Sequence, residues 1–212
     1  MLFRSRLFSD IDLLVPRSQL DEAEAALMLG GWISAADNGY DQRYYREWMH
    51  EVPPLEHVQR GGVIDLHHTI SPPTSRFHVD GARLLERARP LAGSGLFLLA
   101  PEDMVLHSAV HLFQEGEFDH GLRDLLDMDW LLQHFAATEP GFWGQLVARA
   151  AELRLKVPLH HALNHIERLA ASTFPDHDSI GPHSQGVANQ VANGVFAGTF
   201  DIGRLRLQGH DV

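Results

Sequence analysis

The sequence contains no cysteine, which excludes disulfides, thiolate zinc sites, iron–sulfur clusters and cysteine nucleophiles. Lysine occurs once, at Lys156, among 17 basic residues, so anion binding would depend on arginine. No run of 18 apolar residues occurs, and we expect no membrane-spanning helix. The acidic Asp10 and Asp12 interrupt the apolar stretch that a signal peptide needs, so we expect a cytoplasmic protein.

The 212 residues are 44% hydrophobic, which is typical of a soluble globular protein with one or two domains. Acidic residues outnumber basic ones by 28 to 17. The resulting net charge of −11 argues against a broad surface for nucleic acid or anionic lipid.

The front of the chain alternates strand and helix patterns, and the back is helical throughout. The expected front elements are strands over 9–15, 32–35, 55–60 and 63–70, a helix over 18–29 and an extended aromatic segment over 40–48. Helices are expected over 80–89, before the boundary near residue 95, and over 101–113, 118–135, 140–153 and 158–171 after it. We therefore predict an α/β (α+β) chain. A small mixed-sheet domain covers 1–95, a helical domain covers 96–172, and a loosely ordered tail covers 173–212.

Asp10 and Asp12 lie two residues apart on the first strand, so their carboxylates share one face. Mg²⁺ binds oxygen ligands and often takes one or two carboxylates together with substrate phosphates. The apolar neighbours Ile11, Leu13 and Leu14 predict a buried strand, where two unpaired acids would be costly without an ion. The alternative is an exposed strand edge with no metal.

Asp65 is a third acid in an apolar strand, on the polar face that it shares with His67. If the two strands are neighbours, three carboxylates converge, as two-metal phosphoryl transfer requires. At least one of them should then have a raised pKa or lie near an arginine. We expect Asp12→Asn to abolish transfer and to leave stability unchanged or slightly higher, because repulsion is relieved. The alternative for Asp65 is an ion pair with Arg43 or Arg60.

Four segments in order resemble the uncharacterised nucleotidyltransferase family of the DNA polymerase β-like superfamily. They are 6–15 (RLFSDIDLLV), 63–67 (VIDLH), 101–111 (PEDMVLHSAVH) and 122–127 (LRDLLD). The resemblance implies that three acids are catalytic and bind Mg²⁺ or Mn²⁺, and that two further residues contact the nucleoside triphosphate. The three acids are Asp10, Asp12 and Asp65, and the two nucleotide contacts are Arg6 and Ser9.

The implied reaction moves a nucleoside monophosphate, with AMP from ATP as the expected case, to an acceptor hydroxyl. The acceptor is open among a small molecule, a peptide, a protein and an RNA end. We expect no membrane partner, and a homo-oligomer is left open. The alternative is an inactive nucleotide-binding or partner-binding module, similar to an antitoxin, because the family's Gly-Ser or Lys-Gly turn is missing from the nine residues before Asp10.

The helical half is rich in histidine, and His107 and His111 have the i, i+4 spacing of a zinc-binding pair. Further ligands would come from His120, His160, His161 and His165. A metal phosphohydrolase built on His107, His111, His120 and Asp124 is a third hypothesis. Packing, or bonding to nearby acids, is the favoured interpretation of these histidines.

Aromatic residues cluster between residues 32 and 48 and offer surfaces on which a base stacks. They are Trp32, Tyr40, Tyr44, Tyr45 and Trp48. Packing in the core or in a hairpin is the favoured interpretation.

Overall fold

The computed structural model describes residues 10–36, 39–114 and 121–173. Contacts divide the chain into two units, residues 1–116 and 117–212. The predicted boundary near residue 95 lies before helix α4 (Pro101–Gln114), whereas this division lies after it. The assignment of domains stays a prediction. The predicted tail lies outside the described residues except for Thr173, which ends α7.

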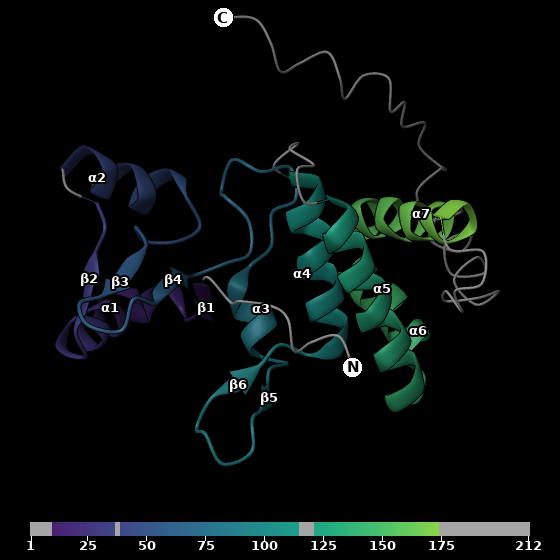
Figure 1. Cartoon of the computed structure of the whole chain (residues 1–212), viewed down its shortest axis with the longest axis horizontal. Helices are drawn as coiled ribbons and strands as arrows, with labels where there is room; N and C mark the ends of the chain where they lie inside the picture. Colours follow the sequence, from purple (N-terminus) through teal and green to yellow (C-terminus); the bar gives the residue numbers. More distant parts are fainter. Residues whose placement is uncertain (1–9, 37–38, 115–120, 174–212) are drawn as a thin grey trace, which may run out of the picture. The chain divides into compact units, whose positions relative to one another are not determined.

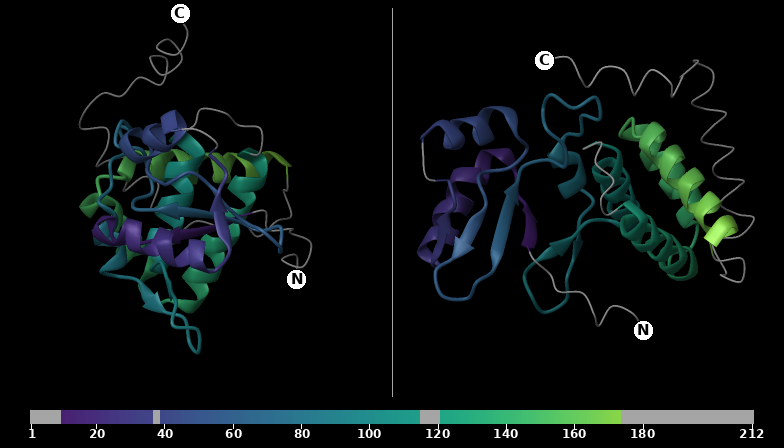
Figure 2. Two further views of the ribbon diagram at one scale, coloured as in Figure 1. Left: turned by 90° about the vertical axis from the view of Figure 1, so that its left-hand side faces the viewer. Right: turned by 45° about the horizontal axis from the view of Figure 1, so that its top comes forward.

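A four-stranded mixed sheet organises the first unit, with the strand order β1-β4-β3-β2 (Figures 1 and 2). Strands β1 (Asp10–Leu14) and β4 (Val63–His67) pair in parallel. Strand β3 (Leu55–His57) is antiparallel both to β4 and to β2 (Trp32–Ser34). The four expected strands therefore form, with shorter bounds than the sequence predicted.

The central strand β4 has one buried and one partly exposed face. Ile64 and Leu66 are buried, while Val63, Asp65 and His67 are only partly covered. This alternation confirms the predicted division into a core face and a polar face, since successive side chains of a strand point to opposite sides.

Strand β1 lies at the edge of the sheet, and the prediction that it is buried is wrong for its first half. Asp10 and Asp12 are exposed, and Ile11 is 55% exposed. An apolar run does not distinguish an edge strand with one paired side from a central strand. The cost of burying unpaired acids therefore does not by itself require an ion here.

Helix α1 (Leu20–Leu29) follows a 3-10 turn (Arg17–Gln19) and contacts the sheet. Gly31, after its end, has a φ of 92°, a conformation that glycine adopts readily.

Residues 40–48, predicted to be extended, lie instead in helix α2 (Gly39–Trp48). Aromatic residues favour strands, but Tyr40, Tyr44 and Trp48 recur every four residues, which is the helical period. Arg46 of this helix donates to Glu24 of α1 at 2.6 Å. Contact between two helices thus overrides the local preference of the aromatic residues.

The first unit is completed by α3 (Gly81–Leu85), a short hairpin and α4. Asp80 caps α3 by accepting a hydrogen bond from the Ala82 N–H at 3.0 Å. The hairpin pairs β5 (Arg89–Pro90) with β6 (Phe97–Leu98).

The described part of the second unit, residues 121–173, contains three helices that pack on one another: α5 (Gly121–Thr138), α6 (Phe142–Glu152) and α7 (Lys156–Thr173). None of the helices in the described part of the chain has both the length and the apolar composition needed to cross a membrane. A small mixed sheet followed by helices confirms the predicted fold class.

Candidate active site

Three carboxylates come together on the first two parallel strands of the sheet. The register places Asp12 opposite Asp65, and Asp10 lies two residues earlier on the same face as Asp12. One carboxylate oxygen from each of the three lies within 4.8 Å of the others. Oxygens that share one Mg²⁺ lie about 3–4 Å apart, because each is about 2.1 Å from the ion. Small side-chain movements would therefore let the three acids share a cation, and their catalytic and metal-binding roles stay predictions.

The negative charge of Asp65 is less well stabilised by its surroundings than that of Asp12. Its Oδ1 is buried and has no hydrogen-bond partner among the described residues. Burial, and then the negative charges of Asp12 and Asp10, raise the pKa of Asp65 against the opposing effect of His67. The described residues show no ion pair with Arg43 or Arg60, which the sequence left open. A divalent cation would neutralise this carboxylate.

Asp12 differs from Asp65 because a histidine supports its charge. His67 Nε2 lies 3.2 Å from Asp12 Oδ1, and a carboxylate only accepts, so the histidine donates. This hydrogen bond lowers the pKa of Asp12, while burial opposes it. The sequence predicted that His67 shares the face of Asp65, but it did not predict that His67 joins the site.

His67 lies between two carboxylates. Its other ring nitrogen, Nδ1, is 3.3 Å from Glu51 Oε2. Burial lowers the pKa of His67, but the hydrogen bond to Asp12 and the charge of Glu51 outweigh it, so the pKa is raised overall. The ring of His50 stacks on that of His67 at 5.1 Å between centroids. Burial, followed by the charge of His67, lowers the pKa of His50 to about 4.

Sequence reasoning missed His50 and Glu51 because a long-range backbone contact brings them to the site. Glu51 forms an isolated antiparallel bridge with His67, beside the end of β4. No periodicity or spacing in the sequence indicates this pairing.

His107 on α4 lies near the same group of residues. Burial, and then the charge of His111, lower its pKa to about 4, and the charge of Asp12 opposes this shift. The two rings meet edge to face with centroids 6.3 Å apart.

The other expected zinc ligands do not join this pair in the described residues. No group of three potential metal ligands there includes His107 or His111. His120 lies outside the described residues, and His160, His161 and His165 belong to the second unit. Asp124, from the phosphohydrolase hypothesis, also belongs to the second unit, where Arg123 Nε lies 3.4 Å from its Oδ1.

The aromatic cluster is only partly packed, so the favoured interpretation is wrong for three of its members. Tyr40, Tyr44 and Trp48 are 77%, 45% and 55% exposed. Trp32 meets His57 edge to face, with ring centroids 5.0 Å apart.

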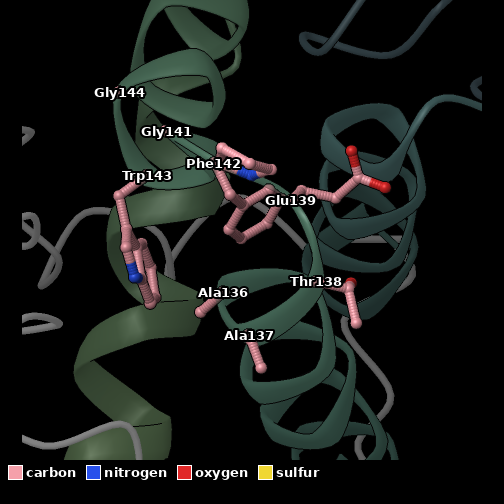
Figure 3. Close-up of a pocket in the computed structure, with 9 residues that line it drawn as sticks. Ala136, Ala137, Thr138, Glu139, Gly141, Phe142, Trp143 and Gly144 are labelled. Atoms are coloured by element: carbon pink, nitrogen blue, oxygen red, sulfur yellow. The ribbon is translucent and has the colours of Figure 1, made fainter.

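A cavity of about 530 Å³ adjoins the site. Its lining includes His50, Ser75, Arg76 and Gln114. A smaller hollow of about 240 Å³ lies in the second unit at the turn between α5 and α6 (Figure 3). Glu139 is the only ionisable residue in its lining, so it offers little chemistry.

Replacing Asp65 by Asn should raise the free energy of unfolding at pH 7 by about 0.5 kcal/mol, a gain that solvent screening keeps small. A carboxyl whose pKa is higher in the folded than in the unfolded state destabilises the fold when it is ionised. The added stability of Asp65→Asn should therefore be fully present above the pKa of Asp65 in the folded state and absent below about pH 3.8, its value in the unfolded state. Urea unfolding at several pH values measures the difference. If Asp65→Asn were less stable than the unaltered protein at pH 7, the claim that the fold disfavours the ionised Asp65 carboxylate would be wrong.

A family model described as an uncharacterised nucleotidyltransferase matches residues 3–171. No curated protein and no solved structure matches the chain. The matched span contains Asp10, Asp12 and Asp65, and also Arg6 and Ser9, which lie outside the described residues.

Proposed function

Because the chain belongs to the uncharacterised nucleotidyltransferase family, we propose that it transfers a nucleoside monophosphate from a nucleoside triphosphate to an acceptor hydroxyl. We propose ATP as the donor and Mg²⁺ or Mn²⁺ as the ion. Family membership supports nucleotidyl transfer as the general activity. The observation that carries the finer proposal is the convergence of Asp10, Asp12 and Asp65 within 4.8 Å.

In the proposed reaction the acceptor oxygen attacks the α-phosphorus of the triphosphate. The bond from that phosphorus to the oxygen bridging the α- and β-phosphates breaks, and pyrophosphate leaves. Asp65, opposite Asp12 on the neighbouring strand, would accept the proton of the acceptor hydroxyl. His67 orients Asp12 through its hydrogen bond. Mg²⁺ held by the three acids would neutralise charge on the triphosphate.

The cavity beside His50 is our candidate for the acceptor pocket. His50 stacks on His67, and His67 contacts Asp12, so the cavity begins two side chains away from the three acids. Arg76 is one of the lining residues, and its guanidinium suits an acceptor that carries a carboxylate or phosphate group. Its volume of about 530 Å³ fits a small molecule or the end of a peptide.

The test incubates the purified protein with each α-³²P-labelled nucleoside triphosphate, Mg²⁺ and a cell extract. We expect a labelled product that needs Mg²⁺ and retains the α-label but not a γ-label. Binding of a nucleotide with no transfer from any of the four triphosphates would favour the inactive module instead.

A further inference from the structure

We propose that His50, Glu51 and His67 form a second metal site, beside the three aspartates, for a divalent transition ion such as Zn²⁺ or Co²⁺. One potential ligand atom from each of the three lies within 4.8 Å of the others. This proposal does not rest on the proposed nucleotidyl transfer activity.

The backbone holds these three residues in place. The His68 N–H donates to the His50 carbonyl oxygen and the Val52 N–H donates to the Leu66 carbonyl oxygen, both at 3.0 Å. These bonds join the segment 50–52 to the end of β4 on both sides of Glu51 and His67. A site whose ligands are positioned by the backbone in this way loses little entropy when an ion binds.

The two nitrogens of His67 have different partners, and this asymmetry favours a cation. Nε2 donates its proton to Asp12, so Nδ1 of a neutral ring carries a lone pair, and it lies 3.3 Å from Glu51 Oε2. Nδ1 is buried and forms no hydrogen bond with a described residue, so the contact with Glu51 lacks the geometry of an N–H donor. A neutral ring and a carboxylate repel each other at this distance, and a positive charge between them, either a proton on Nδ1 or a metal ion in its place, removes the repulsion.

The spacing and surroundings also match those of metal-bound histidines. Ligands about 2.1 Å from a tetrahedral ion lie about 3.4 Å apart, close to the distance from Nδ1 to Oε2. A histidine that binds a metal usually donates its other N–H to a carboxylate, as His67 does to Asp12. The Nδ1 of His50 is also buried without a hydrogen-bond partner in the described part of the chain.

The donor set defines the class of ion. Two imidazole nitrogens and one carboxylate favour Zn²⁺, Co²⁺ or Ni²⁺ over Mg²⁺, which prefers oxygen ligands. The three aspartates offer only oxygen, so the two sites should select different ions. Because His50 also lines the cavity of about 530 Å³, an ion can reach the site from that side.

The test titrates the metal-free full chain with Co²⁺ and records its visible absorption. Co²⁺ should bind with the intense absorption of four or five ligands, and excess Mg²⁺ should not displace it. His50→Gln and Glu51→Gln should each weaken Co²⁺ binding by about tenfold or more. The matched control, His78→Gln, changes an exposed histidine outside the cluster and should bind Co²⁺ as the unaltered protein does.

Asp10→Asn separates the two sites, because it alters the aspartates and leaves the histidines unchanged. It should leave Co²⁺ binding intact. Loss of binding in Asp10→Asn together with intact binding in His50→Gln would place the ion on the aspartates and overturn the proposal. If a histidine variant fails to fold, X-ray absorption of the unaltered protein with Co²⁺ decides the question. Scattering from imidazole rings around the bound Co²⁺ would support the proposed site. Coordination of Co²⁺ by oxygen atoms alone, or no binding, would overturn the proposal.

Discussion

Replacing Asp12 by Asn should lower nucleotidyl transfer by about 10³-fold or more, because removing one electrostatic support of a transition state costs about this much. Asp12 lies between Asp10 on its own strand and Asp65 on the next, so its loss breaks the group of three acids at its centre. Asn keeps the size of the side chain but removes the charge that would hold the cation. The rate of α-label transfer in the presence of Mg²⁺ measures the effect.

The matched control is Asp21→Asn, which removes a carboxylate from the exposed side of α1 in the same unit. This variant should transfer at the rate of the unaltered protein. Equal rates for Asp12→Asn and the unaltered protein would show that the three acids are not the catalytic group.

The effect of Asp12→Asn on stability should differ from what repulsion alone predicts. The hydrogen bond from His67 lowers the pKa of Asp12, so the ionised form is favoured in the folded state. Such a carboxyl contributes stability above its unfolded pKa of about 3.8 and loses it as the pH falls through the folded value. Asp12→Asn should therefore lower the free energy of unfolding at pH 7 by about 0.5 kcal/mol, whereas Asp65→Asn raises it. The rise in stability that the sequence led us to expect for Asp12→Asn is therefore expected for Asp65→Asn instead.

Strand parity was enough to predict the core of the candidate site. Residues two apart share a face of a strand, and an acid within an apolar run marks the polar face of a half-buried strand. These two rules brought Asp10, Asp12 and Asp65 together once their strands proved to be neighbours. The same parity placed His67 on that face, but its hydrogen bond to Asp12, 55 residues away in the chain, depends on a strand register that the sequence does not encode locally.

The parts that were missed depend on contacts between distant segments. Residues 40–48 form a helix whose aromatic spacing is a local sign that strand propensity outweighed in the prediction, and Arg46 of this helix pairs with Glu24 of α1, a contact that the sequence does not show. Glu51 joins the site through its backbone bridge to His67. Propensity and periodicity describe a segment by itself, so they do not report such pairings.

Replacing Gly81 by Ala should destabilise the fold by about 3 kcal/mol or more, at the upper end of the cost of overpacking. A Cβ at this buried position would lie 2.1 Å from the His68 carbonyl oxygen and 3.2 Å from the Cα of Thr69. Both neighbours are backbone atoms, so no side-chain rotation relieves the clash. Either α3 or the segment after β4 must move, and that segment directly follows His67. The midpoint of thermal unfolding should fall by roughly 6–12 °C.

Gly144→Ala is the matched control for this clash. Gly144 lies inside α6, and a Cβ there would meet nothing within 4 Å. Alanine is the better helix former by about 1 kcal/mol, so this variant should be more stable than the unaltered protein. If Gly81→Ala lowers stability while Gly144→Ala raises it, the loss at Gly81 comes from the close backbone contact with His68 and not from replacing a helical glycine by alanine. Equal stability of Gly81→Ala and the unaltered protein would mean that α3 does not pack against the end of β4 as the structure describes.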